Sequence, residues 1–255
     1  MLFRTWRGRI ERGLVAPTGD ETEVLIHMYN TGEIATARVL TPGGRVSYEG
    51  AARIDGVPGD AAPVPLVFEG LAGAMCGALL PSGRAVDMID GVACTPIDNG
   101  MPCVILDASP MGLRGDETRE ALDADEAQKT SLESIRLQAG PLMSLGEVGA
   151  QSVPKMTQVS APRTGGVIAT RSFILHRCHA TIGVFAAVSV ATACTLGEGP
   201  AAALAVLPEG ERFAVEHPGG AAEVLIRRDA DGRVTGAGTL RTARKLFEER
   251  VFPRA

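Results

Sequence analysis

The chain has 255 residues, of which 45% are hydrophobic and 22% charged, and its formal net charge is −5. A chain of this size can bury a sizeable core, in one large domain or two small ones. The acidic balance and the lack of Lys/Arg runs exclude nonspecific nucleic-acid binding, which requires a basic surface. Its five cysteines follow no disulfide or metal spacing, so we expect a reducing, cytoplasmic compartment.

Membrane association is not expected either. The longest apolar stretch, residues 182–194, contains Ser189 and Thr192 and is too short to span a bilayer. The arginines near the N-terminus are not followed by an apolar run, so they do not open a signal peptide.

The first part of the chain reads as a helix end followed by short strands. Glu11–Leu14 predicts the last turn of a helix, with Gly13 as the stop. Strands are predicted at 23–30 and 34–40, joined as a hairpin by the turn Thr31–Gly32. Further short strands at 45–48, 66–68 and 78–80 are separated by segments rich in Gly and Pro.

The middle of the chain alternates strands with one long helix. A strand at 86–97, a tight turn around Asn99–Gly100 and a buried strand at 102–106 come first. Helical spacing and strong helix formers then predict a single helix over 118–143. Two more strands follow, at 155–160 and 167–175.

Residues 178–194 are apolar on every side, which is typical of a fully buried helix. Three strands are predicted after it, at 212–216, 222–228 and 234–240. The final segment, 241–252, fits either a strand or a helix.

The strongest local feature is a polar cluster where a strand leads into this buried helix. It consists of His176, Arg177, Cys178 and His179, followed by Thr181. The first N–H groups of a helix lack partners within it, so this position suits an anion such as a carboxylate. Arg177 could add a two-pronged contact, His179 a hydrogen bond or a proton, and Cys178 a thiolate of lowered pKa.

A structural interpretation stays open for each of these residues. The cluster could be a plain helix cap with a satisfied histidine, and the residues alone do not decide which of His176, Arg177 and His179 faces inward. A metal site is not expected, because no second cluster completes a ligand set.

Three further positions have both a functional and a structural interpretation. Asn99 and Gly100 either face a cleft or form an ordinary hairpin turn. Lys155 is either a cation for an acidic substrate or a solvated charge at the start of a strand. His217, in the turn before Gly219, is interpreted as structural.

Motifs along nearly the whole chain resemble the PrpF-like isomerases, which include 2-methylaconitate isomerases and 4-oxalomesaconate tautomerases. The motifs are Asn30-Thr31-Gly32, Thr41-Pro42-Gly43-Gly44, Tyr48-Glu49-Gly50, Ile54 to Gly59, Leu80-Pro81-Ser82-Gly83, Ile97 to Pro102, Ser152 with Pro154-Lys155, and Arg241-Thr242-Ala243-Arg244. The stretches Asp98–Pro102 and His176–Cys194 resemble the 4-oxalomesaconate tautomerases most.

The resemblance implies an α+β fold of the diaminopimelate-epimerase-like type, in which two similar domains each wrap a curved, mostly antiparallel sheet around a central helix. Residues 1–84 would be the remainder of the first domain, lacking its front half. Residues 85–240 would form the second domain around a central helix near 178–194, and 241–255 would return to the first domain.

The resemblance also implies a function. The enzyme would shift a proton in a small unsaturated tricarboxylate without metal or organic cofactor, as in keto–enol tautomerisation of 4-oxalomesaconate during aromatic-compound degradation. His179, Thr181 and the amides opening the buried helix would hold one carboxylate. Arg177, Asn99, Gly100 and Lys155 would be candidates for the others. A homodimer is compatible with the resemblance.

The sequence departs from the family pattern at its start. The family's Gly-Gly-Thr-Ser-Lys-Gly and Asn-Cys-Gly-Asn motifs, whose Lys and Cys handle the proton, do not occur here, so we expect these catalytic residues upstream of this chain. Two alternatives stay open: another PrpF-like isomerase acting on a substrate such as 2-methylaconitate, and an inactive remnant lacking the catalytic pair.

Overall fold

The computed structural model describes residues 6–28, 34–231 and 234–243. Its strands join into a single curved sheet in the order β1-β2-β3-β12-β11-β10-β8-β7-β6-β5-β4, with β9 paired to β8. The strands are β1 Glu21–His27, β2 Ile34–Leu40, β3 Pro63–Phe68, β4 Asp87–Ile89, β5 Val92–Asp98, β6 Pro102–Asp107, β7 Lys155–Ser160, β8 Ile168–Ile174, β9 Arg177–Cys178, β10 Arg212–His217, β11 Gly220–Arg228 and β12 Val234–Thr242.

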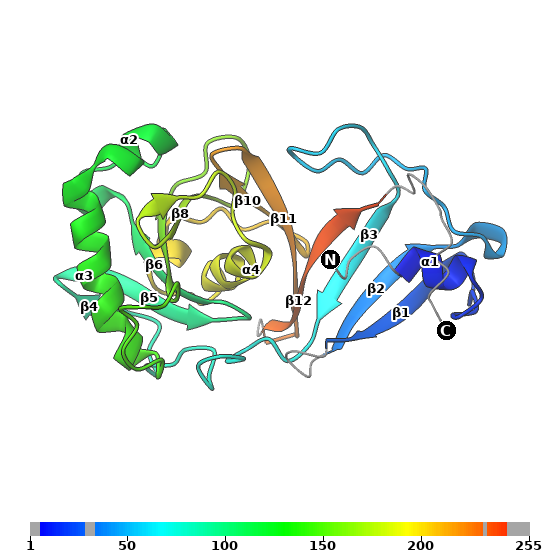
Figure 1. Ribbon diagram of the computed structural model, residues 1–255, viewed down its shortest axis with the longest axis horizontal. Helices are drawn as coiled ribbons and strands as arrows, with labels where there is room; N and C mark the ends of the chain where they lie inside the picture. The colour runs from blue at the N-terminus through cyan, green and yellow to red at the C-terminus, as the bar shows by residue number, and fades with distance from the viewer. Residues whose placement is uncertain (1–5, 29–33, 232–233, 244–255) are drawn as a thin grey trace, which may run out of the picture.

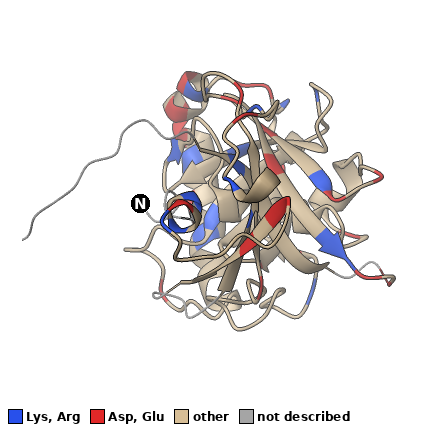
Figure 2. Ribbon diagram, turned by 90° about the vertical axis from the view of Figure 1, so that its right-hand side faces the viewer, with Lys and Arg blue, Asp and Glu red and all other residues tan. Residues whose placement is uncertain are grey.

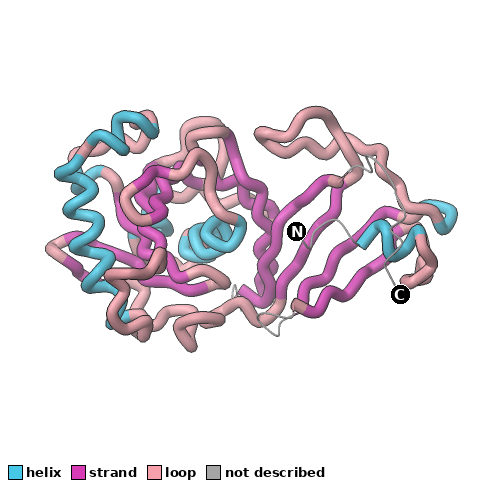
Figure 3. The backbone as a smooth tube through the Cα atoms, in the orientation of Figure 1, coloured by secondary structure: helices cyan, strands magenta, loops and turns pink. Residues whose placement is uncertain are grey.

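Five α-helices accompany the sheet within the described residues: α1 Trp6–Glu11, α2 Arg119–Ala124, α3 Glu126–Leu142, α4 Val184–Ala193 and α5 Pro200–Leu204. Most neighbouring strands are antiparallel; β6 with β7 and β8 with β10 are parallel. Figure 3 shows that strands dominate both halves of the molecule, which confirms the predicted α+β class. No helix in the described residues is long and apolar enough to cross a membrane.

The molecule has two lobes, which meet where β12 lies beside β11 (Figure 1). The smaller lobe contains β1, β2, β3 and α1, and the larger one curls its strands around α4. Because β12 pairs with β3 on one side and β11 on the other, the end of the chain ties the lobes together. The division into domains at residues 84 and 240 stays a prediction, and residues 244–255 of the predicted C-terminal return lie outside the described residues.

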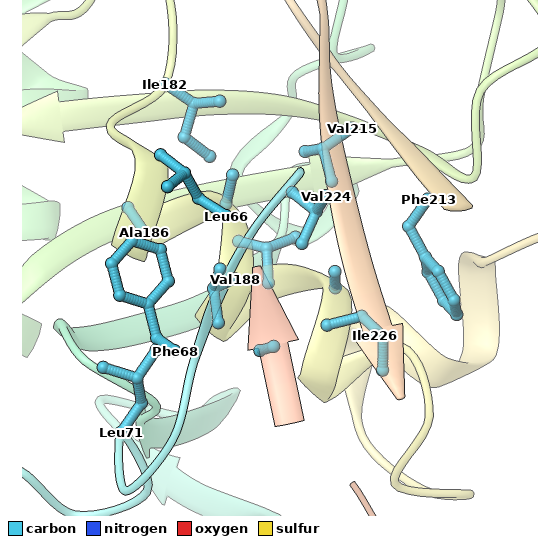
Figure 4. Packing of buried hydrophobic residues seen from close by; sticks show 14 of the residues in the cluster. Leu66, Phe68, Leu71, Ile182, Ala186, Val188, Phe213, Val215, Val224 and Ile226 are labelled. Carbon is cyan, nitrogen blue, oxygen red and sulfur yellow. The ribbon is translucent and has the colours of Figure 1, made fainter. Parts of the chain in front are cut away.

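The centre of the larger lobe is the apolar helix α4. Residues Ala186–Ala193 are buried throughout, as predicted for this segment. Figure 4 shows Ala186 and Val188 of the helix beside Leu66 and Phe68 of β3 and Val224 and Ile226 of β11. Small side chains on α4 let the strands approach closely, and Phe68 meets Phe185 edge to face at 5.1 Å.

The start of this helix is a correction to the sequence analysis. Residues 177–178 form strand β9, and the helix begins only at Val184, with Gly183 as its N-cap residue. Cys178 pairs with Phe173 of β8, and the backbone N–H of Cys178 donates to Asp123 Oδ1 at 2.7 Å. A local strand pairing and one long-range bond hold the segment extended, which apolar patterning alone does not reveal.

Other predicted elements also differ. The helix expected over 118–143 is two helices, because Asp125 ends α2 and caps α3. The strand expected at 86–97 is broken into β4 and β5 by Asp90 and Gly91, both with positive φ. No strand forms at 45–48 or 78–80, and β9 and α5 were missed. The Thr31–Gly32 turn lies outside the described residues.

Candidate anion-binding site

The amino end of α4 is open to solvent. Gly183 is exposed, Val184 and Phe185 are half-buried, and no side chain caps the helix. The N–H groups of the first turn therefore keep their donor capacity, and the helix dipole adds partial positive charge there. This is the arrangement that binds carboxylates and phosphates at helix termini.

His179 and Thr181 lie on the segment that leads into this helix end. The N–H of His179 donates to Ser172 O at 2.8 Å, which fixes the segment against β8. The N–H of Thr181 donates to His179 Nδ1 at 3.0 Å, and Thr181 Oγ1 lies 3.1 Å from the same nitrogen. Because Nδ1 accepts, a neutral His179 ring carries its proton on Nε2, which can donate to a bound anion.

The turn between β10 and β11 lies against the same segment. An added Cβ on Gly219 would stand 3.1 Å from Ala180 O, and the N–H of Gly219 donates to His217 Nδ1 at 3.1 Å. Burial lowers the pKa of His217; Asp55 opposes this shift, while His179 and Arg171 add to it. His217 therefore belongs to the same electrostatic environment as His179, although the sequence favoured a structural role for it.

The smaller lobe contributes Asp55 to this region. Asp55 sits in the loop between β2 and β3, and its Oδ2 accepts the N–H of Ala221 at 2.7 Å, across the boundary between the lobes. In Figure 1 this loop reaches from the smaller lobe toward the top of β11. The two residues that this bond joins are 166 positions apart in the sequence, so no local pattern could predict it.

Asn99 and Gly100 pack against α4 rather than lining its amino end. Asn99 is only 4% exposed; its N–H donates to Ser189 Oγ at 3.1 Å and its amide nitrogen to Thr192 Oγ1 at 2.8 Å. These contacts favour the structural interpretation of Asn99 as part of an ordinary hairpin turn, and its role in substrate binding stays a prediction. Gly100 adopts a φ of 89° beside Phe185, where a side chain would crowd the helix.

The remaining predicted residues are spread around the site. Arg177 and His176 are exposed, and His176 lies near Glu133, whose pKa is lowered mainly by hydrogen bonding to Arg136 and also by the His176 charge. Lys155 is half-buried at the start of β7, where it pairs with Cys103 of β6. Burial lowers the pKa of Lys155; the charge of Arg136 lowers this pKa further, and Cys103 raises it. Of His176, Arg177 and His179, His179 is the residue that contacts Thr181 on the segment leading into α4.

Cys178 does not act as the thiolate that the sequence suggested. It is buried in β9, away from the first turn of α4, and burial raises the pKa of its thiol to about 11. A neutral buried thiol is a packing group. Cys194 is likewise buried, as predicted for a small core residue.

Chemically, this region can receive an anion and orient it. Within residues 6–28, 34–231 and 234–243, no three His, Cys, Asp or Glu side chains gather in a way that could hold a metal ion. The groups that converge are hydrogen-bond donors and imidazoles, and we assign no catalytic acid or base to the described residues.

Two curated relatives match nearly the whole of this chain. A (4E)-oxalomesaconate Delta-isomerase of Novosphingobium sp. (strain KA1) is 56% identical over 95% of this chain and 69% of its own length. A 4-oxalomesaconate tautomerase of Pseudomonas putida is 55% identical over 94% of this chain and 66% of its own. This chain thus spans about two-thirds of the length of these curated relatives.

A solved structure establishes the fold. The crystal structure of a methylitaconate-delta-isomerase superposes with a TM-score of 0.88 at 24% identity, covering 96% of this chain and 69% of that one. The superposition confirms the predicted fold class, and the two curated relatives place the chain in the class of isomerases. The family described as PrpF protein matches residues 8–253, and the chain belongs to the PrpF family.

Proposed function

We propose that this chain acts in the isomerisation of 4-oxalomesaconate, moving a proton between the keto and enol forms of this small unsaturated tricarboxylate. The proposal is supported by the two oxalomesaconate isomerases that are more than half identical to it. An isomerase acting on 2-methylaconitate is the less favoured alternative, because the 2-methyl-aconitate isomerase of Shewanella oneidensis is only 28% identical.

The open amino end of α4 is the observation that carries the site assignment. A carboxylate placed there accepts N–H groups of the first helical turn, and His179 Nε2 and Thr181 add side-chain donors. Fixed donors of this kind also stabilise the negative charge that spreads over the conjugated system when a proton leaves carbon. Gly100 supports this end of the helix because it lies beside Phe185, and Lys155, half-buried at the start of β7, is a candidate cation for another carboxylate.

The test is a direct assay, on 4-oxalomesaconate and 2-methylaconitate, of protein that contains this chain together with the family's Lys and Cys motifs, followed by the ultraviolet absorbance of the conjugated double bond. We expect turnover of the first only, and a loss of about 10- to 100-fold in kcat/KM in His179→Ala, the effect of removing one donor to a charged group. His27→Ala, an exposed histidine on β1, is the matched control and should match wild type. Turnover of 2-methylaconitate alone would overturn the substrate assignment.

A further inference from the structure

Strands β11 and β12 run together for only part of their length. Their pairing extends from Arg228 and Val234 to Val224 and Thr239. Beyond this point β11 remains paired with β10 as far as Gly220, whereas β12 remains paired with β3 as far as Thr242. The two strands therefore diverge, and Figure 1 shows the resulting fork between the lobes.

Arg241 stands on the β12 side of this fork. It pairs with Val64 of β3, and Thr239 pairs with Leu66. Partners across antiparallel strands project from the same face, so Arg241 leaves the sheet on the face where Val64 and Leu66 enter the core. The Arg241 side chain is half-buried there.

The guanidinium of Arg241 has no hydrogen-bond acceptor or carboxylate among the described residues, and burial lowers its pKa. Arg7, which reaches the same end of β12, differs: it donates to the carbonyls of Ala243 and Ala62. A half-buried charge without a partner is costly unless something offsets it. Arg7 therefore has a structural role, whereas the part of the chain that the structure describes leaves the Arg241 guanidinium available to a ligand.

His217 occupies the β10 side of the fork on the same face of the sheet. It follows Phe213 and Val215 at strand spacing, and both of these are core residues. The amino end of α4 lies next to it, as the contact between Gly219 and Ala180 shows. The distance between β12 and β10 is roughly 10 Å, which is two strand spacings, and it increases where β11 and β12 diverge. A small polycarboxylate can bridge that span.

We propose that Arg241 binds a second carboxylate of the substrate, opposite the carboxylate held at the α4 end, and that it selects tricarboxylates over dicarboxylates. This inference rests on the proposed function, because it concerns the same site. The guanidinium supplies two parallel N–H donors, which match a carboxylate.

The test uses calorimetric titration of this chain with two unreactive probes, tricarballylate (three carboxylates) and glutarate (two). We expect Arg241→Gln to bind tricarballylate about 10- to 100-fold more weakly, the loss expected for a charge-assisted hydrogen bond, and glutarate with far less change. Arg241→Gln should therefore lose the preference for tricarballylate over glutarate. Arg212→Gln, an exposed arginine on β10, is the matched control and should bind both acids as wild type does.

The variant Arg241→Lys distinguishes the loss of a ligand contact from a folding defect in Arg241→Gln. It keeps the charge but not the two-pronged geometry, and should bind tricarballylate with an affinity between wild type and Arg241→Gln. Thermal melting of each variant accompanies the titrations. The inference is overturned if wild type does not bind tricarballylate, if Arg241→Gln binds it like Arg212→Gln, or if both acids weaken equally with a lowered melting temperature.

The two proposals fail separately. If wild type binds tricarballylate through Arg241 but does not turn over 4-oxalomesaconate, the subsite stands and the proposed reaction is wrong. If wild type turns over 4-oxalomesaconate and Arg241→Gln retains its KM, the reaction stands and the Arg241 subsite is wrong.

Discussion

Glu216 and His217 are neighbours on β10, yet strand alternation directs their side chains to opposite faces of the sheet. Glu216 Oε1 accepts the N–H groups of Thr164 at 2.7 Å and Gly166 at 2.8 Å, and Oε2 that of Arg163 at 2.9 Å. His217 lies on the α4 face, near His179. Adjacent residues on β10 thus contact different parts of the molecule: Glu216 fixes the loop at residues 163–166, and His217 lies near His179.

His217 should make tricarboxylate binding pH-dependent. Its folded pKa lies below the ordinary value of about 6.5, mainly because of burial, so the ring is neutral at pH 7. A bound carboxylate favours the protonated ring, so binding takes up a proton and strengthens as pH falls through this range. His217→Asn, whose Oδ1 can still accept from Gly219, should flatten the dependence. Tricarballylate titrations from pH 5 to 8 would show it; an unchanged profile counts against the assignment.

Glu216→Gln should destabilise the fold by about 2 kcal/mol, because a charged acceptor of three N–H groups becomes a neutral one. Burial alone would raise the pKa of Glu216, but the N–H donors of Arg163, Gly166 and Thr164 hold it below its usual range. The stabilisation is thus present above about pH 4.3 and is lost as pH falls through the folded pKa. Urea unfolding at pH 7 and pH 3 checks this, since the gap between wild type and variant should shrink at pH 3.

At the scale of elements, local chemistry predicted most of what formed, and long-range bonds decided the rest. The buried helix, the Gly13 stop and the strand-rich second half follow from apolar patterning and turn residues. The extended segment before α4 is held in part by Asp123, which accepts the N–H of Cys178 from 55 residues away. The bond between Asn99 and Thr192 could not be predicted from local patterns either, since the two residues are 93 positions apart.

The break between α2 and α3 could have been found in the sequence, because Asp125 is a good N-cap residue. Its Oδ1 accepts the N–H of Gln128 at 2.9 Å. Asp125→Ala should therefore lower the free energy of unfolding by about 1 kcal/mol through loss of this cap. Chemical denaturation checks it, with the exposed Ser131→Ala of the same helix as control. A variant as stable as wild type would mean that packing alone sets the break.

At the scale of the whole molecule, the sequence patterns do not specify how the lobes meet. The pairing of β12 with β3, and the parallel pairing of β8 with β10, join segments far apart in the chain. The resemblance to a family supplied that arrangement; periodicity did not. Figure 2 shows that both acidic and basic residues occur along the ribbon on the viewed side of the molecule.

Substitution of Asp55 tests whether the hydrogen bond between the two lobes contributes to substrate binding. Its bond to the N–H of Ala221 is exposed, so Asp55→Ala should lower stability by no more than about 1 kcal/mol. The same bond holds the β2–β3 loop over the turn that carries His217, so KM for 4-oxalomesaconate should rise several-fold while the melting temperature hardly moves. Asp60→Ala is the matched control, because Asp60 pairs with Arg53 within the same loop. If both variants raise KM equally, loop order matters and the inter-lobe bond does not; if only Asp55→Ala does, closure of the two lobes over the α4 end is part of substrate binding.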